Sequence, residues 1–324
     1  MKRNAPRRIV RIAVGAAALL SLPLVGLPPV LSPSAALAQP VEPPPALDAR
    51  SIEFPAFEEF TLDNGLRVVV LSYGSQPVLS ARLYVPGGSA LDPAGRAGLA
   101  DLAASVLTRG TETRTAPEIS GTIEGVGGSL SASASQDRLA VSTTVLVEHA
   151  DTAFELLGDV VLRATFPEDE VELARRRRLS SLQAELGQPQ AIAQRHFSRL
   201  VYGGEHPYGT SPTPATVQAI TRDDLVAFRD RVLRPDGALL LVAGRVERGE
   251  VEELVRRHLA DWTGGAVRRA ELPPVRESGE TRIHLVHRPG SSQSVMAVGH
   301  PAVEPDHPDR FSLAVMNRVL GGGS

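Results

Sequence analysis

The stretch GLADLAASVLTRGT, residues 98–111, decides how the rest of this chain is interpreted. It predicts a helix over residues 97–109 that ends at Gly110, because glycine is a weak helix former that commonly follows a helix. The helix carries Asp101, Ala104 and Ser105. Whether it takes part in chemistry or only packs in a core depends on the segments around it.

Patterns on both sides of this helix predict a chain in which strands precede runs of helices. Residues 57–73 predict a β-hairpin around Asp63-Asn64-Gly65, because Asn-Gly between apolar runs is a strong hairpin signal. Further strands are expected at 77–85, at 128–146 as a pair, and at 237–246. Further helices are expected at 115–127, 148–164, 167–185, 191–201, 223–233 and 251–262. This order favours the α+β class, with a mixed or antiparallel sheet packed with helices, over alternating parallel units.

The composition excludes several classes of protein. The chain has 324 residues, enough for about two domains, and contains no cysteine, which rules out disulfides, thiolate zinc sites and thiol nucleophiles. Its single lysine, Lys2, lies at the extreme N-terminus, so the body has no P-loop, kinase or Schiff-base lysine. The formal net charge is −3, and the body without the basic N-terminus is more acidic still, which argues against nucleic-acid binding.

The N-terminus has the order of a secretory signal peptide. Basic residues come first, an apolar run follows over residues 12–31, and Ala36-Leu37-Ala38 forms an A-x-A cleavage site. An uncleaved membrane anchor is the alternative, but prolines interrupt the apolar run. We therefore predict a signal peptide at 1–38, a proline-rich linker at 39–56, and an exported protein, periplasmic or secreted, with no membrane span after cleavage.

The C-terminal part predicts a second module. Residues 57–268 are expected to form the first domain and residues 269–278 a linker. Residues 279–324 are expected to begin a second domain, with two strands around Arg288-Pro289-Gly290 and a helix from about Phe311. The sequence stops on a glycine run soon after that helix starts, which we interpret as a second domain cut off partway.

The order of these segments resembles the insulinase/pitrilysin family of zinc metallopeptidases, which includes the mitochondrial processing peptidases. The segments that carry the resemblance are FTLDNGLRVVVL (60–71), GGSALDPAGRAGLADLAASVLTRGT (87–111), IEGVGGSLSASAS (123–135), HPYG (206–209), ITRDDLVAFRDRVLRPDGALLLVAGRV (220–246), HLADW (258–262), HRPGSSQSVMAVGHPA (287–302) and VLGGG (319–323). Each motif is weak alone, but their order from Phe57 to Ser324 is specific. The resemblance implies one half of a clam-shell peptidase.

The family holds zinc on H-x-x-E-H, whose two histidines lie one turn apart on a helix face and whose glutamate activates the metal-bound water. The resemblance puts Asp101 and Ser105 at the histidines and Ala104 at the general base. The third ligand, a glutamate on a later helix in the family, becomes Leu182, and its supporting acid becomes Arg175. All these roles are lost together, so we predict no zinc, no other cofactor and no catalytic residue.

The family also binds peptides by adding them as a strand to a sheet edge beside the metal, a mode that depends on backbone hydrogen bonds. The matching edge here runs from Gly128 through Ser129, Leu130, Ser131 and Ala132. The family usually has Asn-Ala near the start of this strand, where this chain has Ser131-Ala132. These five residues are our candidates for peptide binding.

Three functions remain open at this stage. The first is a non-catalytic subunit that completes the peptide-binding chamber of an active partner, a zinc-peptidase homologue with H-x-x-E-H, for a peptide or unfolded-protein substrate. The second is an independent peptide-binding or assembly protein. The third is a peptidase with an atypical metal site. The arginine run 175–178 is interpreted as a solvated helix face, with a possible role against an acidic partner.

Overall fold

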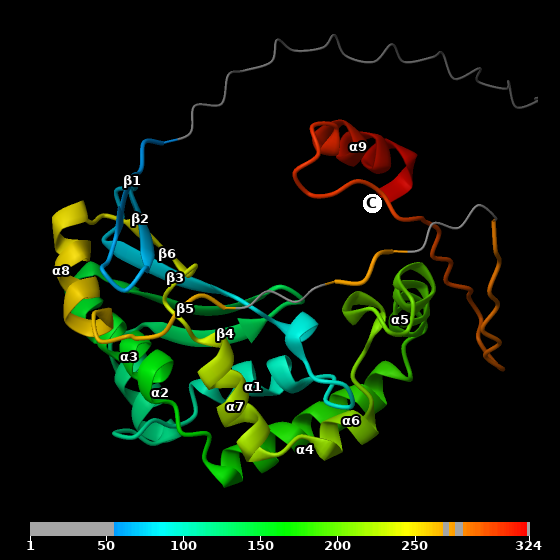
Figure 1. The fold of residues 1–324 in the computed structure, drawn as a ribbon, viewed down its shortest axis with the longest axis horizontal. Helices are drawn as coiled ribbons and strands as arrows, with labels where there is room; N and C mark the ends of the chain where they lie inside the picture. Colours follow the sequence, from blue (N-terminus) through cyan, green and yellow to red (C-terminus); the bar gives the residue numbers. More distant parts are fainter. Residues whose placement is uncertain (1–54, 268–271, 276–280, 323–324) are drawn as a thin grey trace, which may run out of the picture. The chain divides into compact units, whose positions relative to one another are not determined.

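A computed structural model describes residues 55–267, 272–275 and 281–322 (Figure 1). Within them, a six-stranded sheet has the order β1-β2-β6-β3-β5-β4, and β2 and β6 are its parallel pair while the other neighbours are antiparallel. The strands are β1 (Glu58–Thr61), β2 (Arg67–Ser72), β3 (Val78–Pro86), β4 (Ser129–Ala134), β5 (Arg138–Leu146) and β6 (Leu239–Gly244). The predicted α+β class with a mixed sheet is confirmed.

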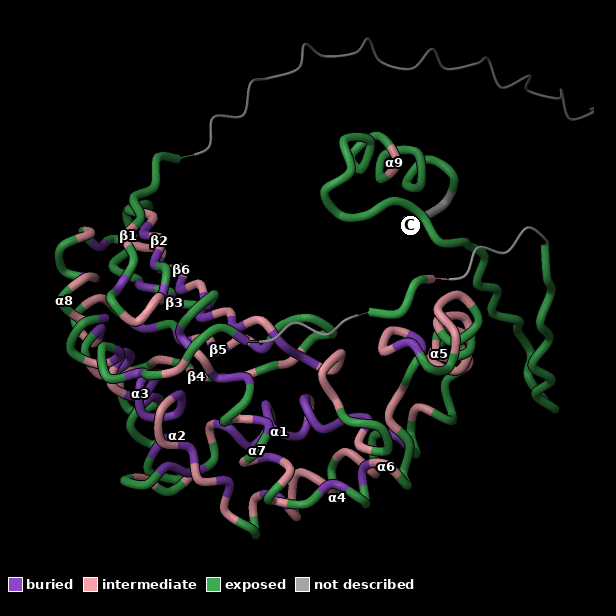
Figure 2. The backbone as a smooth tube through the Cα atoms, viewed as in Figure 1, coloured by how far each residue is buried: buried purple, intermediate pink, exposed green. Residues whose placement is uncertain are grey.

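Helices cover one face of this sheet. The helices that contribute residues to the core on this face are α1 (Leu99–Leu107), α2 (Ala116–Gly125), α3 (Ala150–Arg163), α4 (Glu168–Glu185), α7 (Arg222–Val232) and α8 (Arg248–Leu259). The described residues also form α5 (Pro189–Tyr202), α6 (Pro214–Ala219) and, near the C-terminus, α9 (Arg310–Asn317), which lie outside this core. The sheet, α1, α3, α7 and α8 contribute buried residues to one hydrophobic core. Figure 2 shows the buried residues concentrated in this layer between sheet and helices.

The strands bury alternate residues, as a sheet with one covered face requires. On β3, Leu79, Ala81, Leu83 and Val85 are fully buried, whereas the residues between them are exposed or half-buried. The same alternation holds on β5. On β3 and β5 the covered face carries the apolar side chains that pack on the helices, and the open face carries polar residues such as Arg82 and Ser142.

The predicted hairpin turn is confirmed, and the side chain of its asparagine, Asn64, makes hydrogen bonds both within the turn and to a distant helix. The Asn64 Oδ1 accepts a hydrogen bond from the Leu66 amide at 3.1 Å, which closes the turn, and Gly65 takes a left-handed φ of 90°. The Asn64 side-chain amide also donates to the carbonyls of Leu259 and Trp262, at 2.9 and 3.0 Å. The hairpin is thus tied to the end of α8.

The start of α2 is confirmed at the residue that the sequence indicated. Thr115 and Glu118 form a capping box, in which the Glu118 carboxylate accepts from the Thr115 amide at 2.8 Å. Hydrogen bonds from the Thr115 amide and hydroxyl lower the pKa of the Glu118 carboxyl. Such a box satisfies amide groups that have no partner within the helix.

The two strands predicted around Arg288-Pro289-Gly290 are wrong. Residues 281–302 form a turn at Pro289-Gly290 but no strand, although the helix predicted from about Phe311 is present as α9. Ile283 and Leu285 are 93% and 90% exposed. A hairpin on its own is marginal in water because its apolar face needs a third strand or a helix to cover it, and the described residues supply no such cover.

The expected signal peptide at residues 1–38 lies outside the described residues and stays a prediction, as do the domain limits. Among the residues that the structure describes, no helix is both long and apolar enough to cross a membrane.

Candidate functional site

A pair of backbone hydrogen bonds sets the start of α1, the helix that the resemblance identifies as the metal helix. The Asp92 carboxylate accepts from the amides of Gly98 and Ala100, at 2.8 and 2.9 Å. Burial raises the pKa of Asp92 to about 6, against the opposing effect of these two amides. On its inner face α1 is buried, and it packs against β4, α4 and α7. Its position in the fold therefore depends on both the loop before it and the core behind it.

A cavity of about 320 Å³ lies between α1 and α4. Its lining residues are Asp101, Leu102, Ser105 and Arg109 from α1 and the turn after it, and Glu170, Ala174, Arg177, Arg178 and Ser181 from α4. The structure thus brings together two of the four predicted positions, Asp101 and Ser105. The other two are in the protein interior: Ala104 is 3% exposed and Leu182 is 2% exposed.

The side chains at the degenerate positions do not converge as metal ligands would. The Ser105 hydroxyl donates to the Leu102 carbonyl at 2.8 Å, one turn earlier in its own helix. Leu182 has no donor atom. Within the described part of the chain, no group of three or more His, Cys, Asp or Glu side chains could hold a metal ion. A zinc site needs at least three protein ligands, so this donor set, with one carboxylate at Asp101, does not fit zinc.

Arginines stand beside this carboxylate. Arg178 forms an ion pair with Glu185 at 2.9 Å, and Glu185 pairs also with Arg195 of α5 at 3.1 Å. Burial raises the pKa of Asp101, the positive charge of Arg178 counteracts this effect, and the negative charge of Glu185 adds to it. Asp101 therefore belongs to a network of fixed charges in which a guanidinium supplies the positive charge.

The solvated-face interpretation of residues 175–178 is wrong for its two end members. The Arg175 side chain is only 15% exposed, pairs with Glu172, and donates to the Ile220 carbonyl at 2.6 Å. Arg178 is 25% exposed. Sequence reasoning missed Arg178 and Glu185; their spacing of seven residues, two helical turns, was the available signal. Arg176 and Arg177 are exposed, as predicted.

The five candidate peptide-binding residues lie at the end of the sheet. Ser129 to Ala132 belong to β4, which pairs with β5 and is the last strand in the order. Ser129 and Ser131 are exposed, while Leu130 and Ala132 pack against the core. A Cβ at Gly128 would lie 2.5 Å from the Val145 side chain, so only glycine fits there. Binding of a peptide to this edge stays a prediction.

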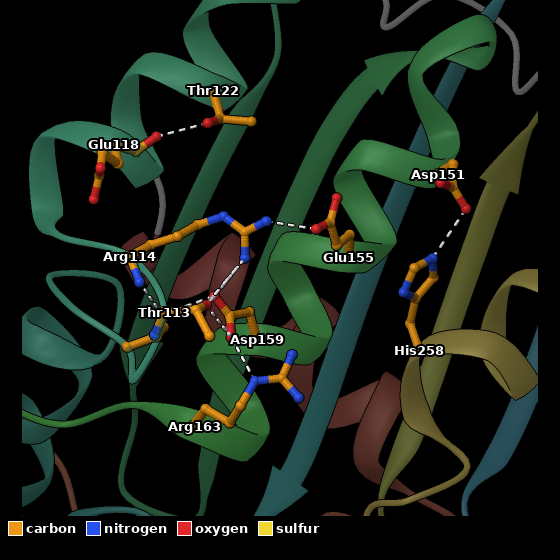
Figure 3. A network of polar contacts seen from close by, with 10 residues as sticks. Thr113, Arg114, Glu118, Thr122, Asp151, Glu155, Asp159, Arg163 and His258 are labelled. Atoms are coloured by element: carbon orange, nitrogen blue, oxygen red, sulfur yellow. Dashed lines mark hydrogen bonds and ion pairs between the residues drawn. The ribbon is translucent and has the colours of Figure 1, made fainter.

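A second polar cluster centres on Asp159 of α3, which is fully buried (Figure 3). Its carboxylate accepts from the Thr111 hydroxyl at 2.7 Å, from Arg114 at 2.9 Å and from Arg163 at 2.7 Å. Arg114 also reaches Glu155 at 2.5 Å. Burial alone would raise the pKa of Asp159, but the hydrogen bonds from Arg163, Thr111 and Arg114 lower it below the usual value. Sequence reasoning missed this network: the spacing of four between Asp159 and Arg163 was an available local signal, but Thr111 and Arg114 come from a separate segment.

The network serves the candidate site by anchoring the turn after α1. Thr111 follows α1 by four residues, and its bridge partner is Ala164, just after α3. An open cavity of about 530 Å³ lies at the outer side of the cluster, lined by Thr113, Arg114, Glu118, Thr122, Glu155 and Arg163. The two basic residues that line this cavity, Arg114 and Arg163, both form ion pairs with Asp159, so the buried carboxylate compensates their positive charge.

Comparison with known proteins agrees with this geometry. Residues 67–208 match the family described as Insulinase (Peptidase family M16), and residues 219–324 match the Peptidase M16 inactive domain. The two matches follow one another along the chain in the order that the sequence segments predicted. The chain belongs to peptidase family M16, the insulinase family.

An uncharacterized zinc protease of Mycobacterium leprae is 31% identical over 271 residues, which cover 81% of this chain and 60% of that protein. Cytochrome b-c1 complex subunit 1 of Bos taurus is 24% identical, over 80% of this chain and 54% of that protein. The chain thus spans about 60% or less of the length of these curated relatives.

Solved structures share the fold. The peptidase M16 inactive domain from Pseudomonas fluorescens has a TM-score of 0.69 at 21% identity, covering 83% of this chain and 65% of that one. The periplasmic protease PqqL from Escherichia coli has a TM-score of 0.59 at 20% identity, covering 70% of this chain and 26% of that one. At this identity the likeness concerns the fold alone.

The donor set at α1 leads to a prediction about metal binding. We expect Asp101→His to bind no stoichiometric zinc, because one imidazole and the Ser105 hydroxyl leave the metal short of the three ligands it needs. Metal analysis of the dialysed protein checks this, with the unchanged chain as control. About one zinc per chain in the unchanged protein, lost in Asp101→Ala, would show that an atypical metal site exists.

Proposed function

We propose that this protein is a non-catalytic member of family M16 that completes the peptide-binding chamber of an active partner, a homologous chain with H-x-x-E-H. One observation carries the proposal: the charged residues that line the cavity at the metal position of the family are three arginines, Asp101 and Glu170, while Ala104 and Leu182 lie buried outside it. A cation is disfavoured among guanidinium groups, and the position of the family's general base is occupied by Ala104, whose methyl group cannot activate water.

The family context supports the same proposal, a non-catalytic subunit. The fold that surrounds the site is retained, including α1, α4 and the end strand β4. The curated relatives include proteins named as zinc proteases and a protein named as subunit 1 of the cytochrome b-c1 complex. The family's fold therefore occurs both in proteins named as proteases and in a protein named as a subunit of a complex. A chain that has the fold but lacks the zinc ligands fits the role of a subunit.

The proposed compartment is outside the cytoplasm. A basic start, an apolar run and an A-x-A site support export. One of the solved structures with this fold is a periplasmic protease. An exported subunit would meet peptides or unfolded segments outside the cytoplasm, together with an exported active partner.

The decisive experiment pairs this protein with an exported homologue that carries H-x-x-E-H. We expect the two to co-elute at micromolar concentration, and the active chain to cleave extended peptides faster when this protein is present. A series of peptide lengths separates two routes. Completion of a closed chamber raises the rate for every length, whereas holding the substrate as a strand on β4 favours longer peptides, because each added backbone hydrogen bond contributes about 0.5–1.5 kcal/mol.

The control is the same assay with the active chain alone, and a second control replaces its H-x-x-E-H glutamate, which must abolish cleavage. If the active chain alone cleaves every length equally fast and the two proteins elute separately, the subunit proposal is wrong. An independent peptide-binding role would then be the better-supported function.

A further inference from the structure

The cavity between α1 and α4 is lined by more basic than acidic side chains. Three arginines line it, Arg109, Arg177 and Arg178, against two carboxylates, Asp101 and Glu170. Arg109 and Arg177 make no hydrogen bond or ion pair with any residue in the described ranges, and both are exposed. Two cations at one cavity therefore have unused donors.

Arg178 adds a further unused donor. Its Nη1 is paired with Glu185 at 2.9 Å, but its Nε is buried and has no hydrogen-bond partner among the described residues. A buried donor without a partner is costly, so the Arg178 guanidinium is not fully compensated by Glu185. Guanidinium groups bind carboxylates with short, directional hydrogen bonds.

A second observation concerns the sheet beside the cavity. α1 packs directly against β4, the end strand. The strands β3, β4 and β5 carry two arginines, Arg82 and Arg138, and no acidic residue. Arg82 lies on the open face, where its Nε donates to the Ser142 hydroxyl at 3.1 Å, and Ser142 is opposite Ser131 of β4 in the ladder. The open face of these three strands therefore carries arginines and no carboxylate, although the whole chain has a net charge of −3.

From these observations we propose that the cavity binds a carboxylate of a peptide, held by Arg109 and Arg177 while the peptide backbone lies along β4. This inference rests on the proposed function and names its substrate class: peptides that present a carboxylate next to the strand-binding segment. The carboxylate comes either from an acidic side chain or from the C-terminus of the peptide. Asp101 opposes it, because a second negative charge shares the same cavity.

Fluorescence anisotropy with labelled peptides of one length tests the proposal. The first peptide has a central glutamate and an amidated C-terminus, the second is neutral with a free C-terminus, and the third is neutral and amidated. We expect the first or the second to bind about tenfold more tightly than the third, the factor for one charge-assisted hydrogen bond at a partly exposed site. Whichever of the two gains affinity identifies the source of the carboxylate.

Variants of this protein link the effect to the cavity. The double substitution Arg109→Gln and Arg177→Gln is expected to abolish the tenfold preference, so that the three peptides bind with equal affinity. Arg176→Gln is the matched control, since Arg176 is exposed in the same run but does not line the cavity. Asp101→Asn is expected to increase the preference. Added salt should weaken the preference in the unchanged protein, because exposed charges are screened.

The outcomes separate this inference from the proposed function. Equal binding of all three peptides, unaffected by the arginine substitutions, overturns the carboxylate site but leaves a peptide-binding subunit intact. A preference lost equally in Arg176→Gln also overturns it, because the effect would then come from general positive charge. Binding of none of the peptides overturns the carboxylate site together with the strand-holding route of the proposed function, while chamber completion would still be judged by the rate of the active partner.

Discussion

Replacing Asp159 with asparagine is expected to lower the free energy of unfolding by about 3 kcal/mol. Asp159 is fully buried, and its carboxylate compensates the charges of Arg114 and Arg163 at 2.9 and 2.7 Å. Removal of one partner of a buried ion pair leaves the other charge unpaired in the protein. Both arginines are partly exposed, so water recovers some of the loss, and we place the effect at the lower end of the range for buried pairs.

Asp151→Asn is the matched control, since Asp151 lies in the same helix and also binds two basic side chains, Arg257 at 2.6 Å and His258 at 2.9 Å. Its side chain is 57% exposed, so its loss should cost no more than about 1 kcal/mol. Urea unfolding of the two variants and the unchanged protein measures both values. Equal, small losses would show that the Asp159 carboxylate is accessible to water in solution.

The pH dependence of the same variant follows from the lowered pKa of Asp159. A carboxyl with a lower pKa in the folded state stabilises the protein above its unfolded pKa, about 3.9, and that contribution is lost as the pH falls through the folded pKa. The stability difference between the unchanged protein and Asp159→Asn should therefore be constant near neutral pH and shrink below about pH 4. A difference that grows on acidification would contradict the assigned direction of the shift.

Replacing Leu182 with glutamate is expected to cost about 3 kcal/mol or more, enough to unfold a marginally stable domain. Leu182 is 2% exposed, so the new carboxylate would lose its water without gaining a partner. This substitution restores the family's third ligand in name, yet we expect no zinc binding and no peptidase activity from it. Even combined with Asp101→His, Ala104→Glu and Ser105→His, it would have to overcome this loss of stability.

Leu186→Glu is the matched control, because Leu186 follows one turn later and is 53% exposed. It should change the stability by no more than about 0.5 kcal/mol. Thermal unfolding followed by circular dichroism compares the two variants. If Leu182→Glu and Leu186→Glu unfold at the same temperature, the side chain at position 182 is reached by water, and the metal position is more open than described.

The sequence by itself determined the local elements and the family. Asn64-Gly65 specified the hairpin, Thr115 and Glu118 specified the start of α2, and the sequence limits of α4 agree with the structure at both ends. These features depend on contacts between residues a few positions apart, so their signals are contained in short windows. The segment order was specific enough to identify the family before any contact was known.

Only the tertiary structure decided how charges are compensated and which strands pair. β6 inserts between β2 and β3, although residues 73–238 separate it from β2 in the chain, and no local pattern specifies such a partner. Asp159 meets Arg163 of its own helix but Thr111 and Arg114 from a distant segment. The run 175–178 divides between two half-buried arginines in ion pairs, Arg175 and Arg178, and two exposed ones. The apolar pattern of residues 281–302 predicted strands that did not form. A strand, an ion pair or a cavity depends on what packs against it from elsewhere in the chain, and that is a property of the assembled core rather than of the residues taken in order.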